Sequence, residues 1–250
     1  MQKIKYFKVP DRLQRLLGNT PLLARQVLPL NNYHELMKVY GWVKDPIIDH
    51  EQTSLFEYPE DINQRRLRDA ESIMTVCRNL AAGTFLEIGT AQGVTTAGMA
   101  TNAPEATIYT INIPPEEAIA GAGGKAITRA FDHSEIGAYY KEKGLSNIKQ
   151  IFANTATWTP NIGTIDLAFI DGCHDTEFVI NDTLAIMPYI RPGGFILWHD
   201  SNLELAPKFH WIASVCRGLE WLCASGSLSG RIYTIRDSWV FIWQAPQVSA

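Results

Sequence analysis

The chain has 250 residues, of which 46% are hydrophobic and 19% charged, and its formal net charge is −4. A chain of this size and composition can build a hydrophobic core without disulfide or metal support, whereas the acidic balance and the lack of a basic stripe argue against nucleic acid as a partner. The sequence has no apolar run of the roughly 20 residues that a membrane-spanning helix needs, and the first residues lack the apolar region of a signal peptide. We therefore expect a cytoplasmic protein with no membrane partner.

The first 62 residues precede the regular pattern of the rest of the chain. This segment contains several prolines and the ring-bearing residues Tyr33, His34, Tyr40, Trp42, Phe56 and Tyr58. We expect residues 1–62 to form an arm that closes over a pocket, mediates a homo-oligomer or packs on the sheet, and the sequence leaves these alternatives open. Residues 63–250 are expected to form one domain.

The domain begins with helix and strand patterns in alternation. Asn63 is suited to cap a helix that continues to Leu80. A strand that ends at Ile88 comes next, followed by a helix over 94–100 and by strands over 107–111 and 147–152. This alternation is typical of βαβ units in a parallel sheet. Two more buried strands are predicted at 165–170 and 195–200, with a turn at 191–194 between them, and the runs 231–235 and 239–243 predict an antiparallel hairpin.

The first of these strands leads into a loop of small residues, with the sequence Glu87-Ile88-Gly89-Thr90-Ala91-Gln92-Gly93. Glycine and alanine let backbone N–H groups approach a ligand closely, and the helix that follows directs its positive end to the same place. A dinucleotide fingerprint requires a third glycine where this chain has Val94, and a P-loop requires a Gly-Lys-Ser/Thr that is absent here. The loop therefore predicts a cofactor site of another kind.

Two later strands also end in polar residues. Asp171 and His174 follow the strand at 165–170, and Asp200 with Ser201 ends the strand at 195–200. Because neighbouring parallel strands end at the same edge of a sheet, we expect these side chains to converge. Carboxylates suit Mg²⁺, and an imidazole with a pKa near ~6.5 can accept a proton at neutral pH.

These segments resemble those of a known enzyme family. The pattern E-x-G-x-A-x-G resembles motif I of the class I S-adenosylmethionine-dependent methyltransferases, and D-L-x-F-I-D-G-x-H and R-P-G-G-x-I-x-x-H-D resemble the fourth and fifth strands of their small-molecule O-methyltransferases. The resemblance covers residues 64–243. It implies a Rossmann-like α/β fold with a seven-stranded, mostly parallel sheet and an antiparallel last hairpin, and methylation of a hydroxyl on a sugar, polyketide or phenolic compound of secondary metabolism.

The resemblance also implies a set of cofactor contacts. Glu87 and the backbone of Gly89, Thr90, Ala91 and Gly93 are expected to hold the methionine end of S-adenosylmethionine, although a carboxylate that caps the next helix is an alternative for Glu87. Position 112 is expected to bind the ribose, Asn154 the adenine, and Asp171 to contribute as well. The family has an acid at position 112, and Asn112 can still hydrogen-bond a hydroxyl but loses the charge-assisted bond.

The catalytic pattern resembles the metal site of catechol-type O-methyltransferases. Asp171, Asp200 and Ser201 stand at the ligand positions, and His174 stands at the position of the lysine base. The alternatives are a Mg²⁺ ion that lowers the pKa of the acceptor hydroxyl and a histidine that is hydrogen-bonded to carboxylates without an ion. His199 is expected either to support these residues from behind or to pack nearby. Two other functions also remain open, namely an inactive cofactor-binding scaffold and a nucleotide-dependent oxidoreductase.

Overall fold

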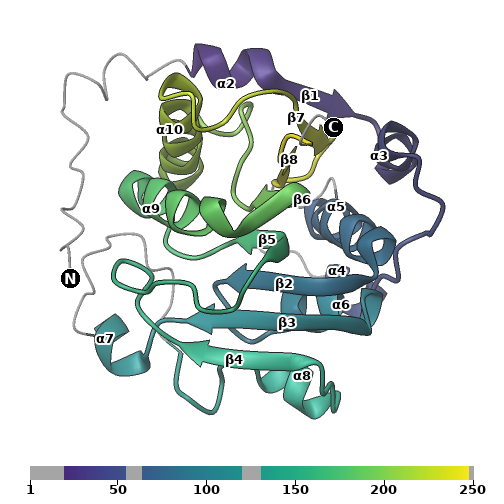
Figure 1. The fold of residues 1–250 in the computed structure, drawn as a ribbon, viewed down its shortest axis with the longest axis vertical. Coiled ribbons are helices and arrows are strands. Elements are labelled where there is room, and N and C mark those ends of the chain that lie inside the picture. The colour runs from purple at the N-terminus through teal and green to yellow at the C-terminus, as the bar shows by residue number, and fades with distance from the viewer. Residues whose placement is uncertain (1–19, 55–63, 120–130, 248–250) are drawn as a thin grey trace.

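The computed structural model describes residues 20–54, 64–119 and 131–247, and within these ranges eight strands form a single sheet (Figure 1). The strand order is β1-β7-β8-β6-β5-β2-β3-β4. Neighbouring strands are parallel except that β8 runs antiparallel to both β6 and β7. The strands are β1 (Val27–Leu30), β2 (Ala82–Ile88), β3 (Glu105–Asn112), β4 (Ile148–Phe152), β5 (Ile165–Ile170), β6 (Ile190–Trp198), β7 (Ile232–Ile235) and β8 (Phe241–Gln244).

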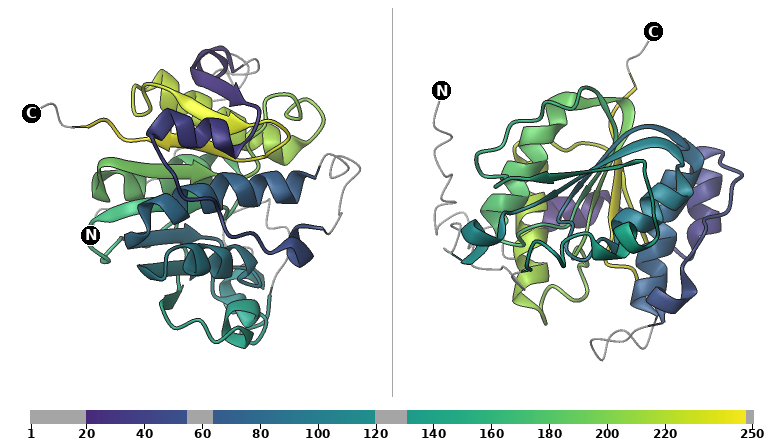
Figure 2. Two further views of the ribbon diagram at one scale, coloured as in Figure 1. Left: turned by 90° about the vertical axis from the view of Figure 1, so that its right-hand side faces the viewer. Right: turned by 90° about the horizontal axis from the view of Figure 1, so that it is seen from below.

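Helices cover both faces of the sheet, so the molecule has three layers (Figure 2). The helices α5 (Arg65–Leu80) and α6 (Val94–Asn102) pack on one face, and α9 (Thr176–Ile186) and α10 (His210–Ala224) pack on the other. Because the central strand β5 is buried on both faces, it is a nearly continuous apolar run. The shorter helices are α2 (Pro21–Gln26), α3 (Tyr33–Tyr40), α4 (His50–Thr53), α7 (Pro115–Ile119), α8 (Ala138–Glu142) and the 3₁₀ turn η2 (Met187–Tyr189).

The predicted α/β class, the mostly parallel sheet and the antiparallel last hairpin are confirmed, but the predicted count of seven strands is wrong. The eighth strand, β1, comes from the segment before residue 63 and pairs in parallel with β7. Its sequence Val-Leu-Pro-Leu has no alternating pattern, and its proline is tolerated because an edge strand needs fewer ladder hydrogen bonds.

The predicted turn at 191–194 is also wrong, because these residues lie inside β6. Ile165 pairs with Ile190 and Leu167 with Phe195, so β6 advances five residues while β5 advances two. Gly193, with a φ of +73°, allows this bulge. The expected helix cap at Asn63 and the aromatic residues Phe56 and Tyr58 lie outside the described residues.

Across the described ranges, no helix combines the length and the apolar character that crossing a lipid bilayer requires.

Candidate functional site

The loop between β2 and α6 has a backbone shape that depends on its small residues. Gly89 has a φ of +104° and Gly93 a φ of +83°, and Ala91 adopts a left-handed φ of +46°. A Cβ atom on Gly89 would lie 2.0 Å from the backbone oxygen of Asp171, so no larger residue fits there. The amides of Gly89 and Thr90 donate to the Ile111 carbonyl at 2.8 and 3.2 Å, which fixes the loop against the end of β3.

Glu87 lies directly before this loop, and its side chain is only 1% exposed. Its carboxylate accepts hydrogen bonds from the hydroxyls of Thr96 and Thr110, the latter at 2.5 Å. Burial raises the pKa of Glu87 to about 8, although both hydroxyls act to lower it. Glu87 does not line the cavity described below, and it makes no cap hydrogen bond to α6. The side chain therefore ties β2 to β3 and α6, which is neither of the two roles that the sequence analysis gave it.

A cavity of about 790 Å³ opens beside the loop, at the carboxyl ends of the central strands. This volume is within the usual range for small-molecule sites. Of the predicted cofactor residues, it is lined by Gly89, Ala91, Asn112, Asn154 and Asp171. Thr90 and Gly93 lie outside the lining, and the Thr90 hydroxyl is instead 2.7 Å from that of Thr110.

The two asparagines of the cavity wall are held in place by the backbone around them. Asn112 accepts a hydrogen bond from the Ala91 amide at 3.1 Å and donates to the Ile113 carbonyl at 2.9 Å. Asn154 accepts from the Ala156 amide at 3.1 Å and donates to Glu117 at 3.0 Å. Each amide still has one lone pair and one proton for a ligand.

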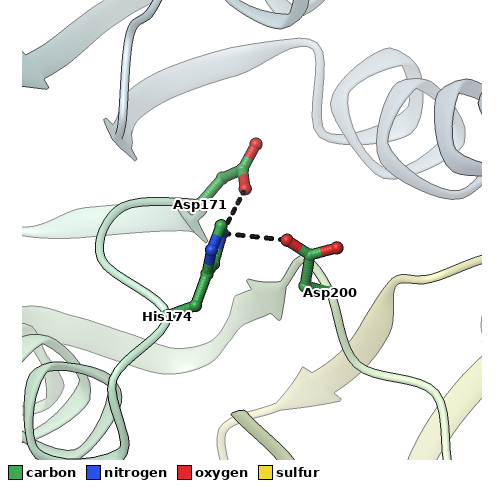
Figure 3. Close-up of side chains that lie close together, drawn as sticks. All are labelled: Asp171, His174 and Asp200. Atoms are coloured by element: carbon green, nitrogen blue, oxygen red, sulfur yellow. Dashed lines mark ion pairs between the residues drawn. The ribbon is translucent and has the colours of Figure 1, made fainter. Parts of the chain in front are cut away.

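Asp171, His174 and Asp200 converge as the sequence predicted (Figure 3). The Nε2 atom of His174 lies 2.8 Å from Oδ2 of Asp200 and 3.7 Å from Oδ1 of Asp171. Burial acts to lower the pKa of His174, but the hydrogen bonds and charges of the two carboxylates outweigh it and raise the pKa to about 10. Burial acts to raise the pKa of Asp200, but the positive charges of His199 and His174 hold it well below its usual range.

His199 extends this cluster towards α5. Its Nε2 atom lies 3.2 Å from Oδ2 of Asp69, and its Nδ1 atom lies 3.1 Å from Oδ1 of Asp171, the latter without the alignment of a hydrogen bond. Burial acts to lower the pKa of His199, but Asp171 and Asp200 raise it well above its usual value. His199 therefore connects Asp69 to the cluster of Asp171, His174 and Asp200.

Asp69 was missed by the sequence analysis. It lies inside α5, and its carboxylate accepts hydrogen bonds from the Ser238 hydroxyl at 2.8 Å and the Trp239 amide at 2.6 Å. Arg65 pairs with its other oxygen at 3.2 Å. The available signal was an acid at a buried position of an amphipathic helix, which is rare unless the acid is paired.

Ser201, a predicted metal ligand, lies close to the cluster in sequence but not in the cavity lining. Its buried hydroxyl makes hydrogen bonds to the carbonyls of Trp198 at 2.8 Å and Trp239 at 3.2 Å. The role that the structure gives it is to link β6 to the turn before β8. The metal-ligand prediction for Ser201 is therefore not supported.

A largely parallel α/β sheet with a glycine loop after β2, polar residues at the ends of β5 and β6, and an antiparallel final strand defines a Rossmann-like methyltransferase fold. Comparison with known proteins agrees with this class. Residues 86–201 match the family described as a methyltransferase domain, and this range contains every site residue predicted from the sequence. None of the curated proteins compared with the chain matches it.

Two solved structures share the fold over most of the chain. The O-methyltransferase NovP is 14% identical, with a TM-score of 0.55 over 86% of this chain and 98% of its own. The cofactor-bound protein Rv0187 from MTB is 16% identical, with a TM-score of 0.52 over 95% of this chain and 97% of its own. The two structures share the Rossmann-like fold of this chain, and residues 86–201 match a methyltransferase domain.

Proposed function

We propose that this methyltransferase transfers the methyl group of S-adenosylmethionine to a hydroxyl of a small molecule. The observation that carries the proposal is a cavity that is lined both by the glycine loop and by Asp171, His174 and His199. NovP, which shares the fold, is an O-methyltransferase, and this supports the proposal. The acceptor class that we propose is a sugar, polyketide or phenol of secondary metabolism.

The cofactor lies beside the glycine loop in this proposal. Gly89, Ala91 and Gln92, which line the cavity, contact the methionine part, the remaining lone pair and proton of the Asn112 amide bind the ribose hydroxyls, and Asn154 binds the adenine. Asn112 compensates in part for the missing acid, because the Ala91 amide already fixes its orientation. Positioning of this kind supplies much of the catalysis of an in-line methyl transfer, which needs no covalent enzyme intermediate.

The acceptor hydroxyl lies against Asp171 and His174 in this proposal. The role of neutral base expected for His174 rested on an ordinary imidazole pKa, whereas the two carboxylates raise that pKa to about 10. His174 is therefore already protonated at neutral pH. We propose that Asp171 accepts the proton of the hydroxyl while the methyl group moves from the sulfur to the acceptor oxygen, which leaves S-adenosylhomocysteine, and that the positive charge of His174 stabilises the negative charge that develops on that oxygen.

A divalent cation is the second way in which this cluster can work. One ligand atom each from Asp171, His174 and Asp200 lie within 4.8 Å of one another, so the residues fit a cation. An imidazole nitrogen beside two carboxylates suits Mn²⁺ or another transition metal better than Mg²⁺. Such an ion would polarise the acceptor hydroxyl as a Lewis acid. The carboxylates of Asp171 and Asp200 would hold it together with the imidazole nitrogen of His174.

The decisive experiment compares His174→Gln with His210→Gln in methyl transfer to a panel of hydroxylated acceptors. His210 is exposed and lies outside the cavity lining, so it serves as the matched control. We expect both variants to bind S-adenosylmethionine and only His174→Gln to turn over more slowly, by roughly 10²-fold. Unchanged turnover in His174→Gln would contradict the catalytic role, and an absence of transfer by the wild type to every acceptor would favour the scaffold alternative.

The pH profile separates the two roles of His174. If the imidazole must first lose its proton, kcat/KM rises about tenfold per pH unit between pH 7 and 9. If its positive charge is what matters, the profile is flat over this range, as we expect. Repeating the profile with metal-stripped protein, with and without Mn²⁺, shows whether a cation takes part.

A further inference from the structure

A segment from the N-terminal part of the chain forms one wall of the proposed cofactor cavity. The lining includes Ile47, Ile48, Asp49, Gln52 and Thr53, which lie in α4 and directly before it. These residues precede α5 in the chain, so none of them belongs to the alternating strands and helices that build most of the sheet. Their position therefore depends on side-chain contacts with other parts of the fold.

The start of this segment is fixed by two asparagines on α5 and α6. The Asn79 side chain accepts hydrogen bonds from the amides of Val43 and Lys44 and donates to the Lys44 carbonyl at 2.8 Å. The Asn102 side chain accepts from the Ile47 amide at 2.8 Å and donates to the Ile47 carbonyl at 2.9 Å. Asn102 is fully buried, so this end is anchored by hydrogen bonds that water cannot easily replace.

Farther along the segment, the described hydrogen bonds to α8 all end on the carboxylate of Asp49, and α4 also packs against α5. One carboxylate oxygen accepts from the Gln52 amide at 3.2 Å and caps α4. The other accepts from the Tyr139 hydroxyl and from Nζ of Lys143, which lies 3.2 Å away. Tyr139 and Lys143 belong to the region of α8 and also line the cavity.

This second attachment differs from the first in its exposure to water. The side chains of Lys143 and Asp49 are 45% and 35% exposed, so salt screens their attraction. The hydrogen bond from Tyr139 lowers the pKa of Asp49, so the carboxylate stays charged at neutral pH. The segment is thus anchored firmly at Ile47 and held at Asp49 by contacts that water and salt can compete for.

We propose that Asp49 is a positioning residue that holds residues 47–53 against α8 and thereby sets how fast the cofactor leaves the cavity. This inference rests on the proposed binding of S-adenosylmethionine there. The cofactor is retained while Tyr139 and Lys143 hold Asp49, and it leaves when this end of the segment moves away. Ile47 is the pivot, because its backbone stays bound to Asn102.

The test uses the full chain with the paired substitution Tyr139→Phe and Lys143→Met, which removes both donors to Asp49 and leaves the cap of α4 intact. The matched control is Tyr109→Phe with Lys149→Met, because Lys149 donates to Tyr109 at 3.3 Å on the exposed surface of β3 and β4, outside the cavity lining. Protein loaded with isotope-labelled S-adenosylmethionine is chased with unlabelled cofactor. We expect dissociation to be about tenfold faster in the first variant and unchanged in the control.

Hydrogen exchange on the cofactor-free protein tests the same attachment without the cofactor. We expect faster exchange at the amides of Gln52 and Thr53 in the first variant, and unchanged exchange at Ile47. Equal exchange in variant and wild type would overturn the inference, as would faster exchange without faster dissociation from a wild type that binds. A wild type that binds no S-adenosylmethionine but shows the expected exchange pattern would instead overturn the proposed function and, with it, the role of Asp49 in retaining the cofactor.

Discussion

Replacing Gly89 with alanine tests whether the glycine loop has the shape described above. The new Cβ atom would meet the backbone oxygen of Asp171 at 2.0 Å, and a backbone oxygen between two central strands cannot move aside cheaply. This overlap costs about 1–3 kcal/mol by analogy with overpacked cores. The φ of +104° adds about 1–3 kcal/mol of backbone strain. We therefore expect Gly89→Ala to lower the free energy of unfolding by roughly 2–6 kcal/mol and to weaken cofactor binding.

The control variant is Gly163→Ala, which separates the two contributions. Gly163 has a φ of +80°, but a Cβ atom there would meet nothing within 4 Å. This variant carries the strain without the overlap, so we expect a loss of about 1–3 kcal/mol. Urea unfolding of both variants measures the difference. If Gly89→Ala costs no more than Gly163→Ala, the close approach of the loop to β5 is wrong.

Three further predictions concern buried polar groups. Burial raises the pKa of Glu87 from 4.5 to about 8, so its contribution to stability is complete below pH 4.5 and is lost as the pH rises to 8. Glu87→Gln should remove up to about 5 kcal/mol of that loss, measured by urea unfolding at pH 5 and pH 8. An unchanged dependence of the unfolding free energy on pH would contradict this prediction. Asn112→Ala should raise the Kd for S-adenosylmethionine about 5- to 30-fold in calorimetry, because it removes the acceptor of the hydrogen bond from the Ala91 amide. An unaltered Kd would exclude Asn112 from the site. Asp69→Ala should lower the unfolding free energy by about 3–5 kcal/mol, because it removes the buried carboxylate that pairs with both His199 and Arg65; a loss below about 1 kcal/mol would mean that the network is not coupled.

The sequence predicted those parts of the fold and site that depend on local pattern. The strands ending at Ile88 and Ile170 are apolar runs with polar residues directly after them, so their direction and the meeting of Asp171 with Asp200 followed from the rules of parallel sheets. The bulge around Gly193 was mistaken for a turn, because Arg-Pro-Gly-Gly has the composition of either structure.

The features of the site that the sequence analysis did not predict depend on contacts between residues that are far apart in the chain. Nothing near Asp69 indicates that His199, 130 residues later, will lie beside it. The Thr110 partner of Glu87 and the Trp239 partner of Ser201 were hidden for the same reason, and neither Glu87 nor Ser201 lines the cavity. The raised pKa of His174 does not follow from the sequence, because it is set by two neighbours whose distances only the structure provides.

The measurement that tests the central claim most directly is a calorimetric titration of cofactor-free protein with S-adenosylmethionine, with NAD titrated in parallel. We expect one site per chain with a Kd in the micromolar range, which corresponds to a binding free energy on the order of −8 kcal/mol, and no heat from NAD. Binding of NAD by folded protein that gives no heat with S-adenosylmethionine would contradict the account.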